Sequence, residues 1–466
     1  MNLSKHKIVA LAALSLFTFV FLAAEYRFDA NVGLLAGSER VILAQGAILG
    51  ASVLGFVGYA LLVRCARRGS RARVIEAVAT VVAVLGMVQV EFPSRALPLE
   101  VLGCVAFVAL GMIGAAAYHA FAMAFRADPK LATGAGAAYA AGIMLQFAVN
   151  LADCAGMPEL AVLGVAIVGA FVLLAAFAER PCAAAACDVS VDPSRDLTRQ
   201  ACWSVALIVI IAALFSALDN VVTLSNARGA IALQTWPRLF LAASGLLAGL
   251  VFDLSERRYM GLVMFGVTAL STISILAVEA GADPTFGLIV FYLSSGFFVT
   301  FFTATFAQLA PHMCVPELWA GMGRAANNLC AFAVSGVSLA LVASDDVALI
   351  MIIALVLLVV AGVVFVAAGL FRLPQTSQER ELLRQADEVL SAPGIEEQRR
   401  AFVEEHGLTS REIDVLAAVT RDERPLKLVA DELGISLRMV QRHLSSIYQK
   451  TGTQTRAGLT KVFPSE

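Results

Sequence analysis

The stretch VALIMIIALVLLVVAGVVFVAAGLF occupies residues 347–371 and contains no charged or strongly polar side chain. A helix that spans a lipid bilayer needs about 20 mainly apolar residues, because a backbone amide or carbonyl without a partner is costly in hydrocarbon. This stretch is therefore predicted to be a membrane-spanning helix. Most of the chain has the same character, since hydrophobic residues make up 59% and charged residues 15% of the sequence. Soluble domains contain roughly 45–50% apolar and about 25% charged residues.

Twelve segments of the chain have this length and composition. They cover residues 8–24, 41–63, 74–92, 99–124, 131–152, 159–178, 201–225, 236–252, 259–280, 285–309, 318–342 and 347–371. Their succession predicts an all-α fold in which a twelve-helix transmembrane bundle fills residues 1–372. A connector at residues 179–200, rich in small and charged residues, divides this bundle into two halves of six spans, at 1–178 and 201–372.

Lysine and arginine residues are distributed unevenly between the two sides of the predicted bundle. Short loops that are rich in these residues tend to remain in the cytoplasm. One side holds Arg27, Arg40, Arg95, Arg228 and Arg238. The side that includes the N-terminus and the central connector holds Lys5, Lys7, Arg64, Arg67, Arg68, Arg71, Arg73, Arg126, Lys130, Arg180, Arg195, Arg199, Arg257 and Arg258. We therefore expect the N-terminus, the connector and the C-terminus to be cytoplasmic.

The loop after the eighth predicted span has a distinctive charge pattern. Its sequence GLVFDLSERR, at residues 249–258, places an aspartate four residues after a glycine and a basic pair beyond it. Together with the two halves of six spans, this pattern resembles the major facilitator superfamily, whose loops after the second and eighth helices carry it. The resemblance implies a transporter-like bundle in which Gly249, Asp253, Arg257 and Arg258 tie helix ends together and bias an inward or outward state. The first-half loop, at residues 58–73, lacks the aspartate. An alternative role for its arginines is to set the membrane topology through their positive charge.

Polar side chains inside the predicted spans are candidates for a ligand site, because burying them in a bilayer is costly without a partner or a cavity. Asp219 stands out, since an isolated carboxylate deep in a helix must bind a proton, form an ion pair or meet water. Arg238 and Arg324 are its possible partners. The alternative is interhelical hydrogen bonding that fixes the packing. The candidate ligand-binding residues are Tyr118, His119, Gln146, Asn150, Asp219, Asn220, Arg238, Arg324 and Asn327.

The sequence contains no pattern typical of a metal, cofactor or enzyme site. His119 has no second histidine, cysteine or carboxylate at a coordinating spacing. No phosphate-binding glycine loop or nucleophile motif is present, so we expect no metal, no cofactor and no enzymatic activity. The cysteines have no CxxC pair and are expected to be packing residues; they are Cys65, Cys104, Cys154, Cys182, Cys187, Cys202, Cys314 and Cys330.

The composition changes from apolar to charged after residue 371. Residues 373–405 carry alternating charges, with an apolar row of helical spacing between residues 382 and 390. Thr376 and Glu379 form a capping box before this row, and the sequence SAPG at residues 391–394 ends it. We expect a cytoplasmic linker helix that packs against its own chain, pairs with a second copy or lies under the membrane.

Residues 408–463 contain a succession of short predicted helices. A capping box of Thr409 and Glu412 begins the first helix, and Pro425 opens the second. Gly434 ends the second helix, because glycine adopts the left-handed conformation at little cost. Ser436 caps the third helix. Two helices joined by a tight glycine turn form a helix-turn-helix arrangement.

The third of these helices has two different faces. Apolar residues recur at three- and four-residue spacing from Leu437 to Ile447 and are expected to face the core of a small domain. The basic residues of the domain gather from this helix onward, which polarises its charge. The face opposite the core carries long hydrogen-bond donors that suit the DNA major groove, namely Arg438, Gln441, Arg442 and Ser445.

A pattern of spaced positions runs through the same segment. It consists of Leu408, Thr409, Arg411, Glu412, Val415, Leu416, Val429, Ala430, Leu433, Ile435, Ser436, Val440, His443, Ile447, Lys450, Gly452 and Arg456. This pattern resembles the LuxR-type helix-turn-helix, a four-helix DNA-binding domain of bacterial transcription regulators, and places that domain at residues 406–466. The resemblance implies that bases are read by Gln441, Arg442 and Ser445, and that Lys427, Arg438, His443 and Lys450 lie nearer the phosphates.

Two positions depart from the usual LuxR-type pattern. Met439 stands where threonine is common, and Gln441 stands where lysine is common. These departures affect the expected sequence preference and nonspecific affinity rather than the fold. The receiver domain of the family is absent from this sequence, so no phosphorylation switch is implied.

The two parts of the chain together predict a membrane-bound one-component transcription regulator in the inner membrane of a bacterial cell. The transporter-like bundle would sense a small-molecule ligand, and the helix-turn-helix would bind double-stranded promoter DNA, with two copies pairing as a homodimer. One alternative is a secondary transporter with a regulatory DNA-binding tail. Another is a tail that binds other proteins and never touches DNA.

Overall fold

The computed structural model of the 466-residue chain forms two compact units, Met1–Thr376 and Ser377–Glu466. The structure describes residues 4–66, 69–126, 128–152, 156–178, 195–227, 237–279, 284–344, 347–367, 402–421, 425–456, 458–459 and 463. The predicted linker helix at residues 376–390 and most of the central connector lie outside these residues.

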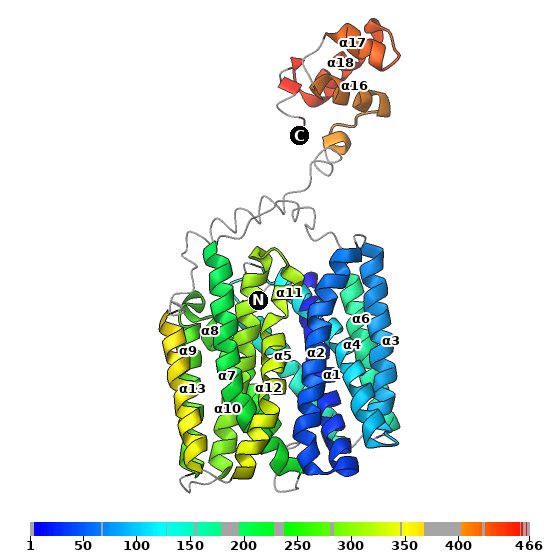
Figure 1. Ribbon diagram of the computed structural model, residues 1–466. Coiled ribbons are helices and arrows are strands. Elements are labelled where there is room, and N and C mark those ends of the chain that lie inside the picture. Colours follow the sequence, from blue (N-terminus) through cyan, green and yellow to red (C-terminus); the bar gives the residue numbers. More distant parts are fainter. Residues whose placement is uncertain are drawn as a thin grey trace. The chain divides into compact units, whose positions relative to one another are not determined.

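The first unit is a bundle of long helices (Figure 1). The first six are α1 (Lys5–Ala36), α2 (Ser38–Ala66), α3 (Gly69–Glu91), α4 (Ala96–Ala124), α5 (Leu131–Leu151) and α6 (Met157–Ala178). The second half contains α7 (Arg195–Ala227), α8 (Pro237–Phe252), α9 (Met260–Glu279), α10 (Pro284–Leu309), the short α11 (Pro316–Ala320), α12 (Met322–Ser344) and α13 (Val347–Ala367). Eleven of the twelve predicted spans each overlap one long helix, and the span predicted at 318–342 covers the end of α11 and most of α12. The predicted all-α fold class is confirmed.

The length and surface of these helices fit a lipid bilayer. Among the described residues, eight helices are long and apolar enough to cross a membrane, and three shorter helices are also apolar. Large aliphatic side chains lie on the outside of the bundle, for example Val165 with 74% and Val366 with 68% of its surface exposed. Such an exposed apolar surface marks contact with lipid. The chain is therefore a multi-pass membrane protein.

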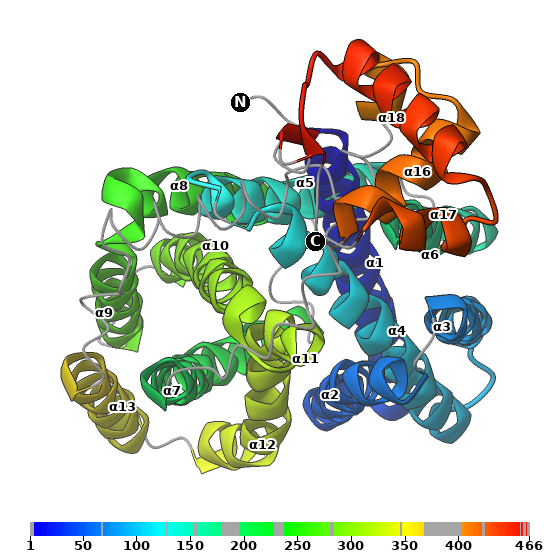
Figure 2. The ribbon, with the colours of Figure 1, turned by 90° about the horizontal axis from the view of Figure 1, so that it is seen from above.

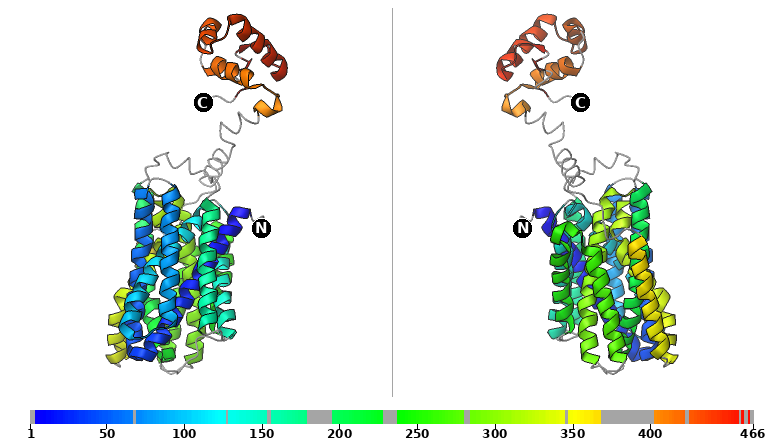
Figure 3. Two further views of the ribbon diagram at one scale, coloured as in Figure 1. Left: turned by 90° about the vertical axis from the view of Figure 1, so that its right-hand side faces the viewer. Right: turned by 90° about the vertical axis from the view of Figure 1, so that its left-hand side faces the viewer.

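The two halves of the bundle meet mainly through two pairs of helices, α2 with α12 and α5 with α8 (Figure 2). The contact between α5 and α8 requires glycine, because a Cβ atom on Gly136 would lie 2.1 Å from the carbonyl oxygen of Gly245. Small residues let helix backbones approach closely in membranes, where van der Waals packing drives helix association. The long helices run side by side along the bundle (Figure 3).

Helix α1 is longer than the span predicted from the sequence. The predicted span ended at residue 24, before Glu25, Arg27 and Asp29, whereas α1 continues to Ala36. These three charged side chains are half-buried among neighbouring helices rather than placed in a loop. The helix continues because partners within the bundle bind its charged groups, among them Glu91 with Arg27 at 2.7 Å.

The second unit contains α16 (Ser410–Arg421), α17 (Leu426–Glu432) and α18 (Leu437–Thr451). Its hydrophobic core lies between these helices and includes Val415, Leu416, Val429, Val440, Leu444 and Ile447. The predicted caps are confirmed. The hydroxyl oxygen of Ser436 accepts a hydrogen bond from the amide of Met439 at 3.3 Å, and Gly434 ends the preceding turn with φ 65°.

Candidate DNA-binding helix and polar cluster of the bundle

Helix α18 presents one polar face to solvent and buries the other. Val440, Leu444 and Ile447 are at most 5% exposed in the core of the domain. The residues on the opposite face are exposed along about two turns of the helix, and they are Arg438, Gln441, Arg442 and Ser445. Neither of the two arginines forms an ion pair with any residue that the structure describes. Their guanidinium groups are therefore available to phosphates or to guanine edges.

Ser445 is oriented by its own helix. Its hydroxyl donates to the carbonyl oxygen of Gln441 at 3.0 Å, which leaves the lone pairs of the hydroxyl oxygen free to accept. Lys427 on α17 is exposed, and His443 is half-buried beside the polar face. The structure thus brings the predicted base-reading residues together on one face and places Lys427 on the neighbouring helix.

Lys450 lies at the end of α18 and takes part in the internal structure of the domain. Its ammonium group donates to Glu412 Oε2 at 2.7 Å and to the carbonyl oxygen of Gly407 at 2.9 Å. These bonds use two of the three donors of the ammonium group. The sequence predicts a position near phosphate for Lys450 but gives no signal for this second role, because the two partners are far away in the chain.

Glu412 on α16 is the centre of a hydrogen-bond network between α16 and α18. Its carboxylate accepts from the amide and hydroxyl of Thr409 at 2.8 Å each, from Ser446 at 2.6 Å and from Lys450. The pair of Thr409 and Glu412 confirms the predicted capping box. Burial of the carboxylate acts to raise its pKa, but the bonds from Lys450, Ser446 and Thr409 outweigh burial and lower the pKa to about 2.

Asp219 on α7, the most prominent ligand-site candidate, shares an electrostatic environment with Arg238 on α8 and Arg324 on α12. Asp219 is exposed, and both arginines are half-buried. No ion pair within 4 Å joins Asp219 to either arginine among the described residues. Asp219 therefore interacts with the two arginines electrostatically over a distance longer than that of an ion pair.

Two further acids belong to the same environment and were missed in the sequence. Glu25 and Asp29 lie one turn apart on α1, and both interact electrostatically with Asp219. Glu25 Oε1 also accepts a hydrogen bond from Gln45 on α2 at 3.0 Å. One feature of the sequence could have indicated these two acids. The apolar sequence continues after Asp29, which allows a single helix to include Glu25, Arg27 and Asp29.

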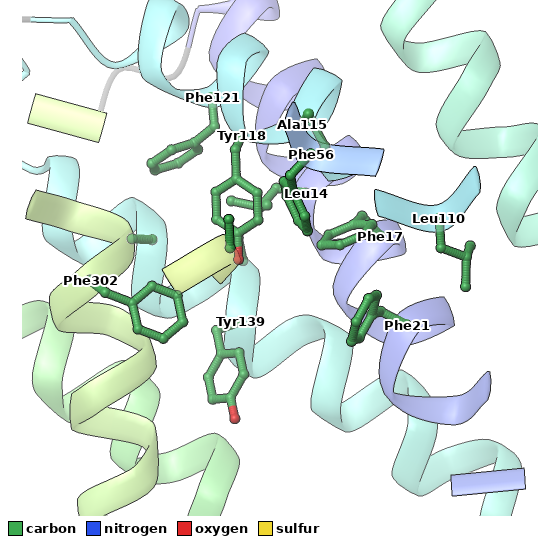
Figure 4. Close-up of a cluster of buried hydrophobic side chains, with 14 of the residues drawn as sticks. Leu14, Phe17, Phe21, Phe56, Leu110, Ala115, Tyr118, Phe121, Tyr139 and Phe302 are labelled. Atoms are coloured by element: carbon green, nitrogen blue, oxygen red, sulfur yellow. The ribbon is translucent and has the colours of Figure 1, made fainter. Parts of the chain in front are cut away.

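Aromatic side chains surround this group of charges. Tyr118 on α4 and Tyr139 on α5 lie beside Phe21 and Phe302 in the interior (Figure 4). The guanidinium group of Arg324 lies over the ring of Phe21 at 4.7 Å from the ring centre. A cation over an aromatic face is attracted by the quadrupole of the ring. Tyr118 thus lies near the charged residues, as a ligand-site role requires.

The remaining ligand-site candidates take part in other contacts. Gln146 is 1% exposed and donates to the carbonyl oxygen of Leu22 on α1 at 3.1 Å, which is interhelical packing. Asn327 contacts Asn328 at 3.4 Å, and His119 interacts electrostatically with Glu317 rather than with Asp219. Asn150 is half-buried near the end of α5. The side chain of Asn220 lies outside the described residues.

The charge motif after α8 connects the two halves of the bundle. Asp253 accepts hydrogen bonds from the amides of Ala132 and Thr133 at 3.1 and 2.6 Å and from the hydroxyl of Thr133 at 2.7 Å. These amides belong to the first turn of α5, where a carboxylate is favoured by the helix dipole. A Cβ atom on Gly249 would lie 2.6 Å from the carbonyl oxygen of Ala132, so this contact needs a glycine.

Arg257 completes the connection, whereas Arg258 does not join it. Arg257 is 3% exposed and donates to Asp253 at 3.2 Å, to Gln308 at 3.1 Å and to the carbonyl oxygen of Asp128 at 3.1 Å. Arg258 is exposed and lies over the ring of Tyr259. In the first half, Arg64 forms an ion pair with Glu317 at 3.6 Å, so its loop has a contact with the second half as well.

Residues 406–463 match the family described as bacterial regulatory proteins, luxR family. This segment is a LuxR-family DNA-binding domain. The expected resemblance is thereby confirmed for the end of the chain.

The whole chain was also compared with curated proteins and with solved structures. No curated protein matches it. Among solved structures, it is similar to the crystal structure of a major facilitator superfamily transporter, FucP, in the outward conformation. The sequence identity is 12% and the TM-score is 0.47, and the similarity covers 80% of this chain and 100% of the transporter.

Proposed function

We propose that this protein is a membrane-bound one-component transcription regulator of the bacterial inner membrane. The observation that supports the proposal most strongly is the exposed polar face of α18, with Arg438, Gln441 and Arg442, in a LuxR-family domain that shares its chain with a membrane bundle. The predicted distribution of basic residues favours a cytoplasmic position for both termini, which would bring the domain to chromosomal DNA.

In this proposal, α18 enters the major groove of promoter DNA. Gln441, Arg442 and Ser445 read base edges, while Arg438 and Lys427 bind phosphates. Domains that dock in this way bind paired half-sites as dimers. Two tethered copies therefore assemble on the promoter.

The membrane bundle is the part of the protein that binds the ligand. A small molecule that binds one conformation of the bundle more tightly shifts the population toward that conformation. The polar cluster around Asp219 is the proposed ligand site, because its charges lie between helices of both halves. Residues 373–405 connect the bundle to the DNA-binding domain. They transmit the conformational change of the bundle, so that α18 is presented differently to DNA.

Genome-wide DNA crosslinking of the full-length protein in its native cells tests the regulator function. The matched sample is the double variant Arg438→Ala/Arg442→Ala, in which two exposed side chains of α18 are truncated without changing the core. We expect discrete peaks in promoter regions for the wild type and their loss in the variant. Equal profiles for both proteins would instead favour a tail that binds other proteins.

A secondary transporter with a regulatory DNA-binding tail is the second candidate function. It is favoured by the connection that Asp253 makes between α8 and the first turn of α5, because contacts of this kind between halves can hold one state of an alternating bundle. Uptake measured in proteoliposomes distinguishes the two functions. A ligand that binds without being transported supports the sensor, and saturable uptake supports the transporter.

A further inference from the structure

Five charged side chains converge in the interior of the bundle from four helices. They are Glu25 and Asp29 on α1, Asp219 on α7, Arg238 on α8 and Arg324 on α12. Asp219 is exposed and the other four are half-buried, so part of each side chain faces open space. Burying charged side chains inside a membrane protein costs free energy, so such side chains face a cavity or a partner. This group of five charged residues is therefore a candidate ligand site.

The charges of the cluster do not balance. Glu25 and Asp219 each interact electrostatically with both Arg238 and Arg324. These two acids therefore compensate the two guanidinium groups. Asp29 is the third acid, and the groups that act on it are Glu25 and Asp219, which are both negative. The excess negative charge of the cluster thus lies at Asp29.

Asp29 also has an unused hydrogen-bond acceptor. Its Oδ1 atom is buried and has no hydrogen-bond partner among the residues that the structure describes. A buried carboxylate oxygen without a donor costs free energy unless a bound group supplies one. A cationic compound that also carries a hydrogen-bond donor, either an N–H or a hydroxyl group, would satisfy both the charge and the hydrogen bond of Asp29.

The surroundings favour an organic cation with a neutral polar group. The buried rings of Tyr139 and Tyr292 interact electrostatically with Asp219 and line the same interior. Aromatic faces attract ammonium groups through their quadrupoles. The Nε atoms of Arg238 and Arg324 are buried and have no acceptor within the described part of the chain, and a ligand hydroxyl or carbonyl oxygen would provide one.

We infer that this cluster binds a small organic ammonium compound with a single positive charge and a hydroxyl or carbonyl group, with Asp29 as the counter-ion of the ammonium. This inference deepens the ligand site of the proposed function and rests on it. The binding experiment that tests it contains no DNA. Its failure is therefore distinguishable from a failure of transcription regulation, which the crosslinking experiment detects.

Choline is the probe, because it carries one ammonium charge and one hydroxyl group. The full-length protein in detergent is titrated with choline chloride, with potassium chloride and with potassium acetate at equal ionic strength, and thermal unfolding is followed. A ligand that binds the folded state raises the unfolding temperature in a saturable way. We expect saturable stabilisation by choline and none by potassium or acetate.

Three variants assign the effect to Asp29. Asp29→Asn should weaken the apparent affinity for choline about tenfold or more, since it removes the counter-ion. Asp29→Glu should restore part of the affinity. Glu100→Gln is the matched control, because it removes an acid of the bundle that pairs with Arg40 outside the cluster, and it should leave the affinity unchanged.

Several results would overturn the inference. Stabilisation by acetate alone would make the arginines the binding groups and the site an anion site. Equal stabilisation by potassium would indicate an inorganic cation. A lack of saturable stabilisation by choline, or an affinity for choline that Asp29→Asn leaves intact, would exclude Asp29 as the counter-ion of an ammonium ligand.

Discussion

Replacing Glu412 with glutamine removes the negative charge that joins α16 to α18. In the folded domain the carboxylate accepts hydrogen bonds from Thr409, Ser446 and Lys450 at 2.6–2.8 Å. Its pKa falls from 4.5 to about 2. One pKa unit corresponds to about 1.4 kcal/mol of difference between the two protonation states, which gives about 3.5 kcal/mol for this lowering of the pKa. Because these charges lie near the surface of a small domain, solvent screening reduces the stabilisation by the charged form to about 2 to 3 kcal/mol.

The pH dependence of this contribution has a definite sign. Because the folded-state pKa is lowered, the stabilisation is fully present above pH 4.5 and is lost as the pH falls toward 2. The glutamine variant has no charge to lose at this position. We therefore expect the difference in stability between wild type and variant to be about 2 to 3 kcal/mol at pH 7 and to shrink as the pH falls through this range.

Urea unfolding of residues 377–466 at several pH values measures this difference. This unit is compact and has its own hydrophobic core, so it is expected to fold by itself. Asp414→Asn is the matched control on the same helix, because Asp414 is 52% exposed and its ion pair with Arg411 is long at 3.7 Å. Its cost should stay within about 0.5 kcal/mol. A Glu412→Gln variant as stable as this control at pH 7 would refute the reasoning.

Three further substitutions have defined outcomes. Arg442→Ala should weaken binding to a crosslinked promoter fragment by about 1 to 3 kcal/mol, measured by fluorescence anisotropy, and unchanged affinity would remove Arg442 from the interface. Leu444→Ala should lower the stability of residues 377–466 by about 2 to 4 kcal/mol in urea, since its side chain is 5% exposed in the core. Gly249→Ala should lower the unfolding temperature of the full-length protein in detergent, because its Cβ atom would lie 2.6 Å from a carbonyl oxygen. Gly266→Ala, with nothing within 4 Å, is its control and should have no such effect.

The sequence predicted the features that depend on local pattern. The caps at Thr409 and Ser436 and the two faces of α18 follow from residues within a few positions of one another. The structure confirms them except at Leu437, which was expected to face the core and is 40% exposed. The spans were located in the same way, because length and apolar composition are local properties. The LuxR-family domain was recognisable for the same reason.

Features that depend on contacts between distant segments were not predictable. The first span was ended at residue 24, because Glu25 and Asp29 read as loop residues when their partners on other helices are unknown. The pairing of Lys450 with Glu412 joins residues that are 38 positions apart. The sequence predicts Asp219 as an acid within a membrane span, but its longer-range interactions with the arginines and its two acidic neighbours depend on the arrangement of four helices.

The bonds that Asp253 makes to α5 have a consequence for how this protein can change during evolution. Two of its three partners on that helix are backbone amides, at 3.1 and 2.6 Å. Every amino acid except proline supplies such an amide. Substitutions at Thr133 can therefore accumulate while both amide bonds persist. Asp253 is held to one residue type, Gly249 must stay a glycine, and the fully buried Ala132 must stay small. A search for pairs of positions that mutate together would not detect this contact between the two halves of the bundle.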